Sequence, residues 1–164
     1  MRGGDTPLVE GNGAMTDKSI VDDFLSQRTL AVVGVSRDPK KFGNTIYREL
    51  KAKGYRVLPV NPKMETCDGD RCYPNLTALP ERPAGAVIVV PPGQTETVVR
   101  DAAAAGIARV WMQQGAESAA AVQFCQEHGI REVHGECILM FASGRSFPHN
   151  MHRWVWGVLG KLPK

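Results

Sequence analysis

The sequence lacks the features that mark several large classes of protein. No apolar run approaches the ~20 residues that a membrane-spanning helix needs, and the first residues hold no apolar segment typical of a secretory signal. Lys and Arg together number 20 and Asp and Glu 17, so the net charge of +3 is too small to indicate nucleic acid or an anionic membrane as a partner. We therefore expect a cytoplasmic protein that binds neither.

Cysteine is also scarce. Four cysteines in 164 residues are too few for a disulfide scaffold in a chain of this length. Cys67 and Cys72 form the nearest pair, but no second pair accompanies them, so a zinc site is not predicted and free thiols are expected.

What the sequence does have is a regular alternation of apolar strands and amphipathic helices. Strands are predicted at 29–35, 56–60, 86–90, 109–112 and 132–134, and helices at 44–53, 95–105 (with Thr95 as its cap) and 118–128. Strands that alternate with helices of this length form a parallel sheet through right-handed crossovers. The predicted fold class is α/β, a doubly wound, Rossmann-like three-layer sandwich with a parallel sheet of about five strands.

The two ends of the chain differ from this pattern. Residues 1–15 are rich in glycine and poor in apolar anchors, so a disordered tail is expected. A helix is expected to begin at Thr16 or Asp17, and residues 16–145 form the predicted Rossmann-like domain. Residues 146–164 contain an amphipathic helix that is expected to pack on this domain, and a homodimer contact through it is possible.

In a sheet of this kind, ligands bind beyond the carboxyl ends of the strands. The first strand is followed by Gly34, Val35, Ser36 and Arg37, and the next helix opens near Gly43. Small residues let backbone N–H groups approach a phosphate, and the helix N-terminus adds partial positive charge. This turn is therefore a candidate pyrophosphate site, with cations such as Arg37 beside it.

The nucleotide signatures that are absent narrow the ligand. The sequence holds neither a P-loop motif nor a G-x-G-x-x-G fingerprint. At the end of the second strand, where NAD-binding proteins carry an acid for the ribose, the chain has Asn61, Pro62 and Lys63. A cation in place of the acid suits a nucleotide with an extra phosphate on its ribose, so NADP and coenzyme A both remain candidates.

Three segments in this order and spacing resemble those of the stand-alone CoA-binding domain proteins. These are small Rossmann-fold proteins, similar to the N-terminal CoA-binding domain of the succinyl-CoA synthetase alpha subunit. The segments are residues 31–36, 54–63 and 110–115, within a match that runs from about residue 29 to 137. The resemblance implies coenzyme A as the ligand, with its 3′-phospho-ADP part at the sheet edge.

Carried over to this sequence, the resemblance assigns a set of binding residues. The phosphate loop would comprise the turn after the first strand with a lysine beyond it, the ribose and its phosphate would meet the end of the second strand, and the remaining segments would meet the base and the tail. The set is Gly34, Val35, Ser36, Arg37, Lys41, Asn61, Lys63, Val90, Pro91, Met112, Gln113, Gln114, Gly115 and Cys137. No metal ligand and no catalytic residue is assigned.

Three functions stay open at this point. The first is a binding or regulatory module for CoA or an acyl-CoA without a reaction of its own, because the synthetase's second domain and partner subunit have no counterpart here. The second is an enzyme acting on a CoA thioester, in which Cys137 or the amides of Gln113 and Gln114 would take part; the neighbouring Glu136 disfavours a thiolate at Cys137. The third is an NADP-type binder.

Overall fold

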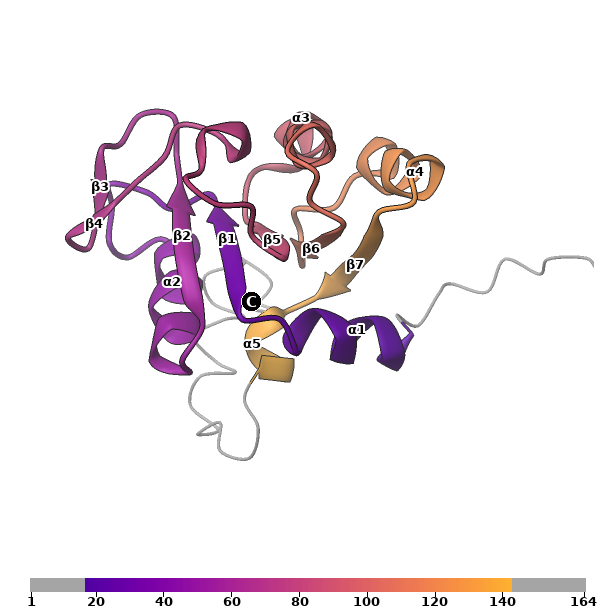
Figure 1. Ribbon diagram of the computed structural model, residues 1–164, viewed down its shortest axis with the longest axis horizontal. Helices are drawn as coiled ribbons and strands as arrows, with labels where there is room; N and C mark the ends of the chain where they lie inside the picture. Colours follow the sequence, from indigo (N-terminus) through magenta and orange to yellow (C-terminus); the bar gives the residue numbers. More distant parts are fainter. Residues whose placement is uncertain (1–16, 143–164) are drawn as a thin grey trace, which may run out of the picture.

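The structure of the protein, a computed structural model, describes residues 17–142. A five-stranded sheet forms its centre (Figure 1). Its strands are β1 (Thr29–Val33), β2 (Arg56–Val60), β5 (Gly85–Ile88), β6 (Arg109–Gln113) and β7 (Arg131–Glu136). The helices are α1 (Lys18–Leu25), α2 (Phe42–Ala52), α3 (Pro92–Ala104), α4 (Ala119–Glu127) and α5 (Ile138–Ala142), and β3 (Thr66–Cys67), β4 (Asp70–Arg71) and the 3-10 helix η1 (Leu76–Ala78) lie between β2 and β5.

The strand order is β2-β1-β5-β6-β7, and every pairing in this sheet is parallel. After β1 the chain adds β2 on one side, and it then crosses back to add β5, β6 and β7 on the other. The order therefore reverses between β1 and β5, which is where open α/β sheets bind their ligands. The predicted doubly wound, Rossmann-like fold with five parallel strands is confirmed.

The sheet separates two hydrophobic cores. In β1, Leu30 and Val32 pack into the core that contains residues of α1, α2 and α5, whereas Ala31 and Val33 pack into the core beneath α3 and α4. All four are buried, as expected for a strand covered on both faces. Figure 1 shows α3 and α4 on one side of the strands and α1, α2 and α5 on the other, which gives the three layers.

Several predicted boundaries need correction. The first strand ends at Val33 rather than residue 35, because the chain turns at Gly34. Helix α3 begins at Pro92 rather than Thr95, since proline fits the first turn of a helix, where its missing N–H is not needed. Thr95 is therefore no cap; it is buried, and its hydroxyl donates to the carbonyl oxygen of Ala116. Helix α5 was not predicted from the sequence.

The predicted tail at 1–15 and the helix predicted within 146–164 lie outside the described residues. The N-cap at Asp17 lies inside them: its side chain accepts a hydrogen bond from the Ser19 N–H. Among the helices of residues 17–142, none is long and apolar enough to span a membrane.

Candidate functional site

The site begins where two backbones touch at the point of strand reversal. Gly34 follows β1 with φ +118°, and Val89 follows β5. A Cβ atom at Gly34 would lie 2.1 Å from the carbonyl oxygen of Val89, so no side chain fits there. Glycine is required at this position both by the positive φ and by the close approach.

The start of helix α2 packs against the same turn. A Cβ atom at Gly43 would lie 2.2 Å from the carbonyl oxygen of Gly34. In the dinucleotide fingerprint one glycine serves this close packing of helix on strand. Gly43 does so here, although its distance from Gly34 in the sequence does not match the fingerprint. The sequence lacks the G-x-G-x-x-G spacing, but Gly43 makes the same close packing of helix on strand after a longer turn.

Asn44, which the sequence analysis missed, holds that turn in place. Its Oδ1 accepts from the N–H of Ser36 at 2.6 Å, and its Nδ2 donates to the carbonyl oxygen of Ser36 at 2.7 Å. Asn44 is 3% exposed, among the apolar residues of the first turns of α2. A polar residue at a core-facing helix position was the available signal.

A second amide joins the turn after β1 to the turn after β2. Asn61 donates from Nδ2 to the carbonyl oxygen of Val35 at 2.6 Å, and its Oδ1 accepts from the Lys63 N–H at 2.7 Å. The guanidinium of Arg37 donates to the carbonyl oxygen of Lys63 at 2.6 Å. Both amide atoms of Asn61 are therefore bonded to backbone groups, so this side chain shapes the two turns.

Two cavities open on either side of the Gly34–Val89 contact. The α3 cavity, of about 640 Å³, lies between the end of β2 (residues 60–63), residues 74–76 and the first turns of α3. The α2 cavity, of about 490 Å³, lies between residues 41–43 at the start of α2 and residues 113–116 at the end of β6. Gly34, Val89 and Val90 line both, so the two cavities meet at the switch point of the sheet.

Most of the residues assigned from the sequence line one of these cavities. Gly34 and Val90 line both; Ser36, Lys41, Gln113, Gln114 and Gly115 line the α2 cavity, and Val35, Asn61, Lys63 and Pro91 line the α3 cavity. Three others line neither. Met112 and Cys137 are buried in the two cores, and Arg37 is an exposed residue that bonds to the backbone of Lys63.

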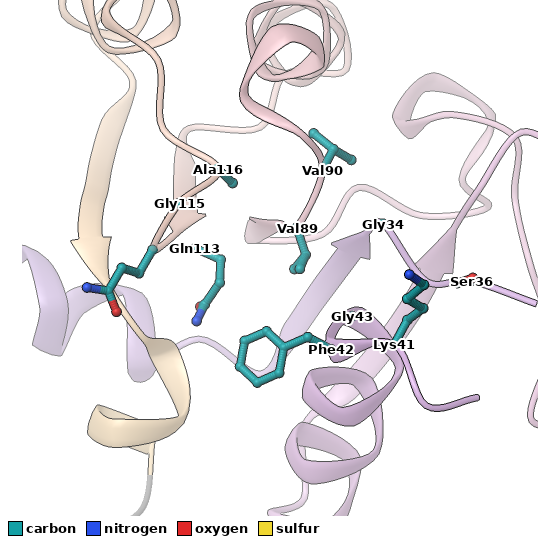
Figure 2. A pocket seen from close by; sticks show the side chains of 11 residues that line it. Gly34, Ser36, Lys41, Phe42, Gly43, Val89, Val90, Gln113, Gly115 and Ala116 are labelled. Atoms are coloured by element: carbon teal, nitrogen blue, oxygen red, sulfur yellow. The ribbon is translucent and has the colours of Figure 1, made fainter. Parts of the chain in front are cut away.

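Gln113 differs from the other lining residues. It is 1% exposed at the end of β6, and its Oε1 accepts from the backbone N–H of Ile138 at 3.1 Å. Its Nε2 is buried and has no hydrogen-bond partner. Figure 2 shows its side chain extending from the end of β6 toward the ring of Phe42, across the α2 cavity.

Three buried thiols, those of Cys67, Cys72 and Cys125, are poorly suited to nucleophilic chemistry. Burial raises the pKa of Cys67 to about 11 and that of Cys125 to about 12, and it raises the pKa of Cys72 as well. These thiols are therefore protonated at neutral pH, and only a thiolate attacks efficiently. Within residues 17–142, no three or more His, Cys, Asp or Glu side chains gather so that they could hold a metal ion.

Curated relatives are much longer than this chain. It is 38% identical over 73 residues to the alpha subunit of an ADP-forming acetate–CoA ligase II from Pyrococcus furiosus, covering 44% of this chain and 16% of the relative. It is 30% identical over 141 residues to the ADP-forming acetate–CoA ligase II of Archaeoglobus fulgidus, covering 77% of this chain and 21% of the relative. The chain thus spans about a fifth of these relatives.

Similar solved structures are of comparable size. A conserved hypothetical protein from Pyrococcus furiosus is 38% identical with a TM-score of 0.67, covering 70% of this chain and 98% of that one. A hypothetical protein from Pyrococcus horikoshii OT3 is 29% identical with a TM-score of 0.72, covering 84% and 94%.

The sequence profile of the CoA binding domain family matches residues 28–143. The matched range includes all five strands of the sheet and both cavities. The chain therefore belongs to the CoA binding domain family, and the resemblance inferred from its sequence is confirmed.

Proposed function

We propose that this chain binds coenzyme A, or an acyl-CoA, across both cavities, as a module without a reaction of its own. The nucleotide lies in the α3 cavity and the pantetheine tail in the α2 cavity. The observation that carries this proposal is that the two cavities meet at the backbone of Gly34, on the line where the strand order reverses. A ligand passing over Gly34 would occupy both.

The α3 cavity suits a phosphorylated nucleotide. Pro91, Leu76 and Val98 offer apolar surface on which a flat base can pack. Lys63 supplies a cation for a phosphate on the ribose. The cavity also borders the N-terminus of α3, whose N-cap Pro91 makes no side-chain capping bond, so the partial positive charge of the helix faces this space.

The α2 cavity suits a narrower and less charged group. Phe42, Val89 and Ala116 give it apolar walls, and Gln113 and Gln114 bring amides. Among the described residues, no His, Asp, Glu or Cys lines this cavity; Lys41 is its one ionisable side chain. These residues therefore bring no carboxylate, imidazole or thiol to the reactive end of a thioester, and Lys41 is the one side chain that could transfer a proton there, which supports a binding module over an enzyme.

The test is calorimetric titration of the full chain with CoA, dephospho-CoA, adenosine 3′,5′-bisphosphate and NADP. We expect micromolar CoA binding, and binding of dephospho-CoA about tenfold weaker because Lys63 loses its charged partner. Lys63→Gln should abolish this difference, whereas Lys53→Gln, at the far end of α2, should preserve it. A chain that does not bind CoA, or that binds NADP equally well, contradicts the proposal.

A further inference from the structure

Gln113 carries a hydrogen-bonding group that the protein itself does not use. Among residues 17–142, its Nε2 is the one side-chain nitrogen or oxygen that is buried without a partner. A buried amide without a partner disfavours folding, because the N–H groups lose water and gain nothing in return. Such an atom is a candidate for contact with a ligand when it borders a cavity, as Gln113 does.

The orientation of this amide is set by its other end. Oε1 of Gln113 accepts from the backbone N–H of Ile138, the first residue of α5. Rotating the amide by half a turn would place its NH2 group against that N–H donor and leave both without an acceptor. This bond therefore fixes which end of the amide faces the Ile138 N–H and leaves Nε2 on the other side.

The fold places Gln113 where an apolar residue would be expected. Trp111, two residues earlier on the same strand, is fully buried in the core that contains α1, α2 and α5. The pairing of β6 with β7 is irregular between Trp111 and Gln113. The extra residue lies in β7, so β6 keeps its alternation and Gln113 faces the same side of the sheet as Trp111. On that side, beyond the core, Gln113 borders the cavity beside Phe42 (Figure 2).

From this geometry we infer that Nε2 of Gln113 donates a hydrogen bond to a carbonyl oxygen of the ligand in the α2 cavity. The inference rests on the proposed function and deepens it. The donor is neutral, the walls at Phe42, Val89 and Ala116 are apolar, and the cation Lys41 lies on the opposite side of the cavity from Gln113 (Figure 2), which favours a neutral acceptor at this donor over an anion. The tail of an acyl-CoA offers two sources of such an oxygen, the amides of pantetheine and the thioester carbonyl.

The test compares Gln113→Met with Gln123→Met in titrations with CoA, acetyl-CoA and adenosine 3′,5′-bisphosphate. Methionine has nearly the shape of glutamine but no donor. Gln123 is exposed on α4 and bonds to Glu127, so the same substitution there should change no affinity. Removing the buried donor at Gln113 should weaken binding of the tail by about tenfold and leave the bisphosphate, which has no tail, unaffected.

The outcomes separate the two sources of the carbonyl. An equal loss for CoA and acetyl-CoA supports a pantetheine amide as the acceptor, and a loss for acetyl-CoA alone supports the thioester carbonyl. Unchanged affinities, or a loss that extends to the bisphosphate, overturn the inference. If the unsubstituted chain binds the bisphosphate but neither CoA nor acetyl-CoA, the proposed function fails, and with it the inference that rests on it.

A second measurement uses the unsubstituted chain, because Gln113→Met also removes the acceptor of the Ile138 N–H and the variant could fail to fold. The side-chain NH2 resonances of Gln113, assigned through its backbone by NMR, should shift when CoA or acetyl-CoA saturates the protein and stay in place with the bisphosphate. If the NH2 resonances of Gln113 shift with neither CoA nor acetyl-CoA, the inference is overturned.

Discussion

The α3 and α2 cavities share the Gly34–Val89 contact, but the side-chain amides beside them have different roles. Around the α3 cavity, Asn61 bonds to the backbone with both of its amide atoms. Beside the α2 cavity, Gln113 bonds with its oxygen alone and keeps its nitrogen without a partner. The Asn61 amide thus fixes the shape of the cavity wall in the protein without ligand, whereas the Gln113 amide keeps an N–H donor that no protein group accepts from.

This difference separates two ways in which a polar residue can contribute to binding. A residue whose hydrogen bonds are all satisfied within the protein acts by preorganising the backbone around the ligand. A residue with an unsatisfied donor acts by direct contact, and the protein without ligand is less stable for it. Loss of a residue that preorganises the backbone should lower the affinity of every ligand that contacts that wall. Loss of a residue with an unsatisfied donor should lower the affinity only of ligands that carry the matching acceptor.

The largest effect is expected for Gly34→Ala, which disturbs both cavities at once. The new Cβ would collide with the Val89 carbonyl at a positive φ, so we expect the free energy of unfolding to fall by about 3 kcal/mol and CoA binding to be lost. Chemical denaturation and calorimetry measure the two effects.

Gly54→Ala is the matched control for that variant. Gly54 also has a positive φ, +92°, but an added Cβ there meets nothing within 4 Å. It should lower the free energy of unfolding by about 1 kcal/mol through backbone strain alone and leave CoA affinity unchanged. If the two variants have equal free energies of unfolding, the close approach of Val89 is not the reason that Gly34 must be glycine.

The second prediction concerns the wall of the α3 cavity. Asn61→Ala leaves the Val35 carbonyl and the Lys63 N–H without partners, so unfolding free energy should fall by about 2 kcal/mol. The affinities for CoA and for adenosine 3′,5′-bisphosphate should fall together, by about tenfold. Asn61→Asp keeps the acceptor for the Lys63 N–H but sets a carboxylate oxygen against the Val35 carbonyl and a negative charge beside the phosphates, so it should lower both affinities at least as much as Asn61→Ala. If Asn61→Ala leaves the affinity for the bisphosphate unchanged, Asn61 does not shape the wall of the nucleotide site, and the contrast with Gln113 fails.

The sequence was sufficient to predict the sheet, because a strand buried on both faces and a helix with one apolar stripe leave clear patterns. Most of the binding residues assigned from it line a cavity, since the residues that follow parallel strands gather at one edge of the sheet. Val35, Lys63 and Gly115 could be assigned to that edge without knowing any contact between them.

What the sequence could not supply were contacts that depend on the packed structure. The bond from Asn44 to Ser36 requires the close approach of Gly43 to Gly34, which a longer turn than usual conceals. The free nitrogen of Gln113 depends on α5, a helix of five residues that no pattern predicted. Met112 is fully buried in the core beneath α3 and α4, so it lines neither cavity.

The smallest effect is expected for Thr95→Val, because Thr95 lines neither cavity and bonds to Ala116, which lines the α2 cavity. The buried Thr95 hydroxyl ties helix α3 to the carbonyl of Ala116, and valine has the same shape without the donor. Unfolding free energy should fall by about 1 kcal/mol, and CoA affinity about twofold, with bisphosphate affinity unchanged.

Thr77→Val is the control for that substitution, since Thr77 is exposed and its hydroxyl bonds to Asn75 near the surface. It should change neither stability nor CoA affinity measurably.

Comparing Thr95→Val with Gln113→Met then separates the effect of the unpartnered donor on Gln113 from the effect of moving the loop that follows β6. Both residues border the same loop, but Thr95 is satisfied within the protein, so its loss should act on stability more than on binding. A loss of CoA affinity for Thr95→Val as large as that for Gln113→Met would mean that the position of the loop, and not the donor on Gln113, decides how the tail is held.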